Sequence, residues 1–266
     1  MTGPTTNPSL PRWLYLPAGL AMLLAALPIL GLLVRIPWTR LVELVGQPES
    51  VAALRLSLLT CTASLVLVVL FGLPLAVLLA RTRGPLAQLG RVLAVLPMVL
   101  PPVVAGLALL VTLGRRGLLG AQLSAWGVEI GFTTLAVVLG QTFVAMPYFV
   151  VALEGALRTL DPEFERVAAT LGASPTRTLT RVTLPLLAPA LIGGAAMAFA
   201  RALGEFGATL TFAGSLPGVT QTLPQAIYLT RESDPDGALA LSFVLLVLAV
   251  VLMGLSGWAA RRQPHD

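Results

Sequence analysis

Six long intervals without a charged residue constrain this chain more than any other feature of its sequence. Each is 19 to 25 residues long, and a helix needs about 20 residues to cross a hydrocarbon core of ~30 Å. Barrel strands would be about 10 residues long and would alternate in polarity, a pattern that the intervals lack. The sequence therefore predicts an all-α integral membrane protein with six transmembrane helices. The uncharged intervals are residues 14–34, 56–80, 92–114, 130–153, 182–200 and 237–260.

We expect a single transmembrane domain over residues 14–262, between an N-terminal tail (1–13) and a C-terminal tail (263–266). The first span is longer than the core of a secretory signal and lacks a convincing cleavage site, so we expect it to be retained. The fifth span should continue past Arg201 toward Phe212. The expected spans are about 14–34, 56–80, 92–114, 130–153, 185–212 and 237–260.

The charged residues indicate a lipid bilayer as partner and not a nucleic acid. Only 11% of the residues are charged, against about 25% in soluble domains. The net charge is +5, but the arginines stand at the ends of apolar runs instead of forming a stripe, which is typical of membrane orientation.

The residue types that are missing argue against chemistry within this chain. All 17 basic residues are arginine, so no lysine is available for a phosphate-binding loop or a Schiff base. The one histidine, His265, is the penultimate residue, and the one cysteine, Cys61, falls inside an apolar run. We expect no catalytic residue, metal site or cofactor here, so that any energy source belongs to another chain.

The arginines also predict an orientation, because cytoplasmic loops carry the excess of basic residues. With the N-terminus inside, ten arginines are cytoplasmic and six are external, which favours two cytoplasmic termini. The cytoplasmic set is Arg12, Arg81, Arg83, Arg91, Arg158, Arg166, Arg177, Arg181, Arg261 and Arg262, and the external set is Arg35, Arg40, Arg55, Arg115, Arg116 and Arg231.

The longest polar interruption is DPEFERVAATLGASPTRTLTRVTLP, residues 161–185. Its first two residues, Asp-Pro, predict the start of a short helix with Pro162 at the first helical position, and Gly172 predicts its end. Ser174 and Pro175 predict the start of a second short helix. Its charges exclude it from lipid, so this helix pair should lie on the cytoplasmic face and be available to a partner. The alternative is a solvated loop without a partner.

Small residues recur every four positions in the fifth span, which lets helix backbones approach closely in lipid. One series is Ala196, Ala200, Gly204 and Ala208, and the other is Gly194, Ala198 and Ala202. This span should therefore pack centrally, against other spans or a second copy.

Arg201 and Glu205 are the only charged pair within a span, and their spacing allows them to neutralise each other on one helix face. An intramembrane charge is a functional candidate, so we consider these two residues, with Thr209 and Thr211, as the translocation pathway or gate. We favour a structural or gating ion pair over a polar station for anions. Beyond this span, residues 223–231 predict a short external helix that either docks an outside partner or caps the bundle.

The segment RVAATLGASPTRTLTRVTLP resembles the EAA loop of ABC importer permeases, which has the pattern Glu-Ala-Ala, three residues, Gly, nine residues, Ile, one residue, Leu-Pro. The matching positions are Ala168, Gly172, Leu184 and Pro185, with Val182 in place of Ile. The resemblance implies that this element fits a groove on an ATPase subunit and transmits its closure.

The EAA resemblance departs from the family pattern at its start. Arg166 and Val167 stand where Glu and the first Ala are expected, and Glu165 comes one residue early. The coupling residues that the resemblance implies are Glu165, Arg166, Ala168, Ala169, Gly172, Ala173, Ser174, Pro175, Leu184 and Pro185.

The segment RALGEFGATLTFAGSLPGVTQTLP, residues 201–224, resembles molybdate ABC transporter permeases of the ModB type, and LPMVLPPVVAG and QTFVAMPY extend the likeness. This implies the type I importer permease fold in a bacterial or archaeal cytoplasmic membrane. It also implies two copies forming the channel, two ATP-binding cassette subunits that hold ATP and Mg, and an extracytoplasmic molybdate-binding protein. Alternatives are a sulfate, thiosulfate or tungstate permease, an ATP-independent secondary anion transporter, and a membrane scaffold without transport.

Overall fold

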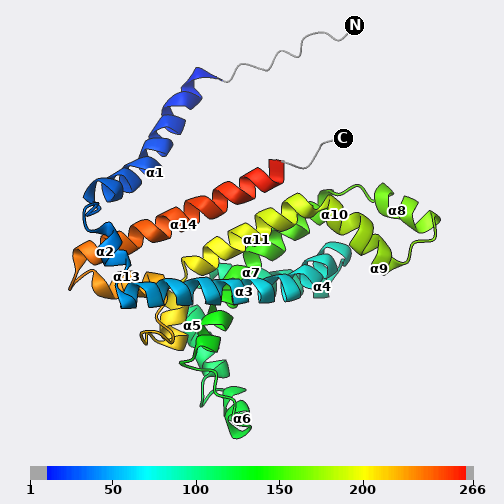
Figure 1. Cartoon of the computed structure of the whole chain (residues 1–266). Helices are drawn as coiled ribbons and strands as arrows, with labels where there is room; N and C mark the ends of the chain where they lie inside the picture. The colour runs from blue at the N-terminus through cyan, green and yellow to red at the C-terminus, as the bar shows by residue number, and fades with distance from the viewer. Residues whose placement is uncertain (1–10, 262–266) are drawn as a thin grey trace.

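The computed structural model describes residues 11–261, and within this range the chain forms helices and connecting loops without a strand (Figure 1). The all-α prediction is confirmed for these residues. Most of the two predicted tails, together with His265, lies outside the described range.

Within residues 11–261, four continuous helices are long and apolar enough to cross a membrane. Two pairs of shorter helices, bent by 117° and 73°, raise the number of candidate spans to six if each pair is one span. The continuous helices are α1 (Tyr15–Arg35), α3 (Pro48–Arg81), α7 (Thr134–Thr159) and α14 (Pro235–Arg261). Shorter elements outside the two pairs are η1 (Arg12–Leu14), α2 (Leu41–Val45) and α6 (Gly120–Ala125).

Prolines cause the sharper of the two bends. Helix α4 (Pro85–Val99) ends before Pro101, and α5 (Pro102–Leu113) begins directly after it, at an angle of 117°. Two consecutive prolines remove two backbone donors and force the preceding residue out of helical geometry; Leu100 is accordingly extended, with ψ 135°.

The expected fifth span is broken in two places. Between α10 (Leu184–Leu186) and α11 (Ala188–Leu203) the axis turns by 73° at Leu187. The helix that we expected to continue to Phe212 stops at Leu203, and α12 (Gly207–Ala213) starts anew. Ala208 of the first small-residue series therefore belongs to a different helix from Ala196 and Ala200.

Helix α7 is the centre of the bundle and packs against α3, α4, α11 and α12 (Figure 1). The second small-residue series allows this packing, since Gly194, Ala198 and Ala202 are all buried. A Cβ atom on Gly194 would lie 3.3 Å from side-chain atoms of Phe149 and of Ala152. This part of the packing prediction is confirmed. Helix α1, in contrast, contributes no buried residue.

The remaining short elements gather at opposite ends of the bundle. Elements α8 (Glu163–Thr170), α9 (Pro175–Thr178) and η2 (Leu179–Thr183) lie beyond the end of α7, whereas α13 (Leu223–Thr230) lies with α2 at the far end (Figure 1). The short helix predicted at residues 223–231 is thus confirmed.

Candidate functional site

The polar segment folds as two short helices, as predicted. A Schellman motif at the C-terminal end of the first helix forms the turn between them. Helix α8 begins one residue later than expected, at Glu163, whose amide donates to Oδ1 of Asp161 at 2.9 Å. At its other end Gly172 has φ +78°, and its amide donates to the Ala169 carbonyl at 3.0 Å. The amide of Ala173 donates to the Ala168 carbonyl, also at 3.0 Å. The glycine is needed because an L side chain disfavours this φ.

The second short helix, α9, continues without a break into η2, a turn of π-helix, and then into α10. The Ser174 side chain accepts from the amide of Arg177 at 3.4 Å and caps α9, as predicted. π-Turns inside helices are rare and often stand at functional sites. Here the π-turn brings Thr183 into the interior, where it is fully buried.

Glu165 ties this segment to the bundle through two contacts. Its Oε1 accepts from the Thr183 hydroxyl at 2.6 Å, and it forms an ion pair with Arg81 at the end of α3. The hydrogen bond from Arg81 lowers the pKa of the Glu165 carboxyl below its ordinary value; partial burial opposes this shift, and the Thr183 hydroxyl adds to it. The carboxylate is therefore held in its charged form between α3 and the start of α10.

The other predicted coupling residues divide into those that line a cavity and those that do not. Ala169, Ala173 and Pro175 line a cavity of about 350 Å³ together with Arg81, Glu165, Thr178, Leu179 and Thr183. Ala168 and Leu184 are half-buried, whereas Pro185 is exposed. Arg166 faces outward and pairs with Glu163 at 2.6 Å. Glu165, not the residue aligned with the family glutamate, thus makes the internal contacts.

Sequence reasoning missed an exposed apolar face on α8. Phe164, Val167 and Leu171 are 50%, 47% and 82% exposed, and their spacing of three and four residues places them on one side of the helix. Arg81 was also missed as the partner of Glu165. The helical periodicity of the three apolar residues was visible in the sequence, but the contact across 84 positions was not.

The second candidate site is the break between α11 and α12. The Arg201 guanidinium lies 2.6 Å from Oε2 of Glu205, whose side chain is 1% exposed. Oε1 of Glu205 accepts from the amide of Ala208 at 2.7 Å, at the start of α12. The predicted pair therefore forms, and its carboxylate also satisfies a backbone donor that the break leaves free.

Thr209 and Thr211 make local hydrogen bonds in this arrangement. The Thr209 hydroxyl donates to the Phe206 carbonyl at 3.0 Å and accepts from Gln225 of α13 at 3.3 Å. The Thr211 hydroxyl donates to the Gly207 carbonyl at 2.8 Å. The Gln225–Thr209 hydrogen bond and the tilted contact between the rings of Phe206 and Tyr228, whose centroids lie 4.9 Å apart, join the break to α13.

Close backbone contact fixes α12 against α5. A Cβ atom on Gly106 would lie 2.6 Å from the Ala208 carbonyl oxygen, and one on Gly207 would lie 2.7 Å from Cβ of Pro102. The bend at Pro101–Pro102 and the break at Glu205 therefore pack directly on each other. The importance of these two glycines was not evident from the sequence.

Comparisons with known proteins assign this architecture to a class. Residues 72–264 match the family described as binding-protein-dependent transport system inner membrane component, and the chain belongs to that family. It is an integral membrane transport subunit with the fold of ABC importer permeases. The solved structure of a bacterial ABC transporter involved in the import of alginate matches with a TM-score of 0.67 at 20% identity, over 94% of both chains.

Two sequence relatives are more specific. The chain is 54% identical over 244 residues to the molybdenum transport system permease protein ModB of Mycobacterium bovis, a match that covers 92% of each protein. It is 41% identical over 202 residues to ModB of Escherichia coli, covering 73% of this chain and 88% of that relative.

Proposed function

We propose that this chain is the permease subunit of an ATP-driven molybdate importer, in which two copies form the channel. The observation that carries the proposal is the identity of 54% to a ModB permease, sustained over 92% of both chains. The break between α11 and α12, which the Arg201–Glu205 pair bridges, lies in the segment whose residues most resemble molybdate permeases. The partners in this proposal are a second copy, two ATP-binding cassette subunits and an extracytoplasmic molybdate-binding protein.

In the proposed mechanism, α8 and α9 receive the movement of the ATPase subunits. The exposed face of Phe164, Val167 and Leu171 offers apolar surface to a groove on the ATPase. Such a face at a soluble surface is typical of a docking site. The coupling residues implied by resemblance, from Glu165 to Pro185, remain a prediction in this role.

Glu165 gives this movement two routes into the membrane. Its pairing with Arg81 leads to α3, and its hydrogen bond with Thr183 leads through α10 to α11. A short helix fixed by a cap at each end passes on a displacement better than a slack loop. ATP-driven closure then brings the α8–α9 segments of the two copies together and rocks the spans open to the outside.

At the other end of the bundle, α13 lies where docking of the binding protein can be transmitted to the gate. Its contacts with Phe206 and Thr209 connect an external helix to the break that Arg201 and Glu205 stabilise. In this proposal the ion pair serves the gate and does not by itself select the anion.

The chain supplies no ATPase site of its own in this proposal, and the partner subunits bind ATP and Mg. Both termini lie in the cytoplasm of a bacterium or archaeon, on the same side as α8.

The test is reconstitution of the chain with its ATPase and binding protein in proteoliposomes, with labelled molybdate as cargo. We expect ATP-dependent uptake in which molybdate outcompetes sulfate. Preferred uptake of sulfate, thiosulfate or tungstate would assign the subunit to another oxyanion, whereas unchanged uptake with a hydrolysis-deficient ATPase would indicate a secondary transporter.

A further inference from the structure

A basic pocket of about 670 Å³ lies where α3 ends, α4 begins and the last turns of α7 meet them. The proposed coupling does not use it. Three arginines from three different segments line it, namely Arg83 in the α3–α4 loop, Arg91 in α4 and Arg158 in α7. The remaining lining residues are Ala80, Thr82, Gly84, Pro85 and Gln88.

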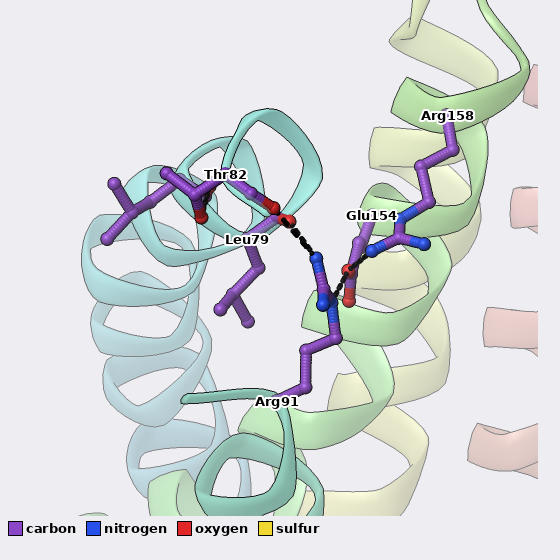
Figure 2. A network of polar contacts seen from close by, with 6 residues as sticks. Leu79, Thr82, Arg91, Glu154 and Arg158 are labelled. Atoms are coloured by element: carbon purple, nitrogen blue, oxygen red, sulfur yellow. Dashed lines mark hydrogen bonds and ion pairs between the residues drawn. The ribbon is translucent and has the colours of Figure 1, made fainter. Parts of the chain in front are cut away.

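Two of the three guanidinium groups of the basic pocket, those of Arg91 and Arg158, share one carboxylate, that of Glu154. Arg91 Nε lies 2.7 Å from Oε1 of Glu154, and Arg158 lies 2.7 Å from the same oxygen (Figure 2). Arg83 forms no ion pair within residues 11–261 and is exposed. The lining of the basic pocket therefore carries surplus positive charge, although Arg83 and Arg158 also line an adjoining cavity that contains Asp161 and Glu165.

Arg91 has a structural role besides its charge. It donates to the carbonyl oxygens of Leu79 at 2.6 Å and of Thr82 at 3.1 Å, where α3 ends (Figure 2). Arg91 therefore holds the α3–α4 corner to α7 through Glu154, whereas Arg83 and Arg158 leave donors free for a ligand.

An apolar groove of about 430 Å³ runs between α3 and α4 and adjoins the basic pocket. The two share Thr82 and Arg83. Leucine side chains form the groove walls, and Leu86 is 81% exposed. The leucines are Leu75, Leu78, Leu79, Leu86, Leu89 and Leu93.

We propose that an anionic phospholipid occupies this combined site, with its phosphate in the basic pocket and an acyl chain in the groove. Guanidinium groups bind phosphate oxygens through paired hydrogen bonds, and basic pockets between spans on the cytoplasmic side suit anionic headgroups. The adjoining groove favours a lipid over a free oxyanion, which has no apolar part to bury. The bound lipid would fasten α4 to α3 beside the coupling segment.

The test compares lipid retention by the purified, assembled importer in detergent, measured by native mass spectrometry. Phosphatidylglycerol and phosphatidylcholine with identical acyl chains are the probes. We expect the double variant Arg83→Gln/Arg158→Gln to retain phosphatidylglycerol about tenfold less than wild type, with phosphatidylcholine unchanged. The matched control is Arg116→Gln, which removes an exposed arginine from the loop after α5.

Four results would overturn the proposal. The first is equal retention of the two lipids by wild type, and the second is an unchanged preference in the double variant. The third is displacement of long-chain phosphatidylglycerol by glycerol phosphate or molybdate at equal concentration, which would make the pocket a free-anion site. The fourth is disulfide cross-linking of two copies in the membrane through Leu86→Cys, which would show that protein, not lipid, covers the groove.

Discussion

Gly172 provides the sharpest test of how the α8–α9 turn works, because a substitution there changes the backbone and nothing else within this chain. Its φ is +78°, and a Cβ atom at this position would meet nothing within 4 Å. Gly172→Val therefore introduces no clash within the chain. Its cost is that of an L residue in the left-handed region, about 1–2 kcal/mol, and the β-branch makes this region still less favourable.

That strain competes with the hydrogen bonds that hold the turn. The amides of Gly172 and Ala173 donate to the last carbonyls of α8, and each such bond contributes about 0.5–1.5 kcal/mol net. Because the two quantities are similar, the valine variant should open the turn in a large fraction of molecules. A change of 1.4 kcal/mol alters the equilibrium tenfold.

The assay measures molybdate uptake per ATP hydrolysed in proteoliposomes that contain the ATPase and the binding protein. Gly172→Val should hydrolyse ATP but lose severalfold in uptake per ATP. Gly172→Asn is the matched control, since asparagine tolerates the left-handed conformation, and it should retain most of the coupling. Equal losses in both variants would refute the backbone argument and indicate a steric contact with the partner; no loss in either would refute the coupling role of the turn.

Three further predictions follow from the same geometry. Leu171→Asp should weaken co-purification of the ATPase subunit at least tenfold, because it places a charge in the docking face. The control Leu118→Asp, at a site near α6 that is 79% exposed, should not weaken it. Equal binding of the ATPase by both variants would exclude this face of α8 as the docking site. Because the folded pKa of Glu165 is lowered, its anchor should be intact above the ordinary pKa of a glutamate and be lost as pH falls through the lowered folded value. A spin label at position 170 should then gain mobility in acid in wild type but not in Glu165→Gln, which should be mobile at neutral pH as well. Arg201→Met should destabilise the folded chain by about 3 kcal/mol, which is the lower end for a broken buried pair because the Arg201 side chain is 26% exposed. The double variant Arg201→Met/Glu205→Gln should recover most of that loss. An unchanged melting temperature of the single variant in detergent would contradict this prediction.

The features that could be predicted from the sequence are those encoded by neighbouring residues. The Ser174 cap, the Gly172 turn and the short helix at residues 223–231 each depend on a few adjacent positions, and all are present. The Arg201–Glu205 pair was predictable for the same reason, since four positions separate its members.

The features that were missed depend on residues far apart in the chain. Nothing near Glu165 indicates that Arg81 and Thr183 are its partners, and nothing near Gly106 shows that α12 packs against it. The break at Leu203–Gly207 was missed although Gly204, Glu205 and Gly207 stand in it, because nothing in the sequence shows that the Glu205 carboxylate accepts from the Ala208 amide at the start of a new helix. Two consecutive prolines, Pro101 and Pro102, indicate a bend, but its angle of 117° depends on the surrounding packing.

The central claim is that this subunit moves its anion only when a separate ATPase drives it. The most direct measurement is molybdate uptake into ATP-loaded proteoliposomes, made with the subunit alone, with the complete complex, and with a complex whose ATPase cannot hydrolyse ATP. We predict uptake by the complete complex only. Uptake of molybdate down its gradient by the subunit alone, at a rate comparable to that of the complex, would contradict the claim.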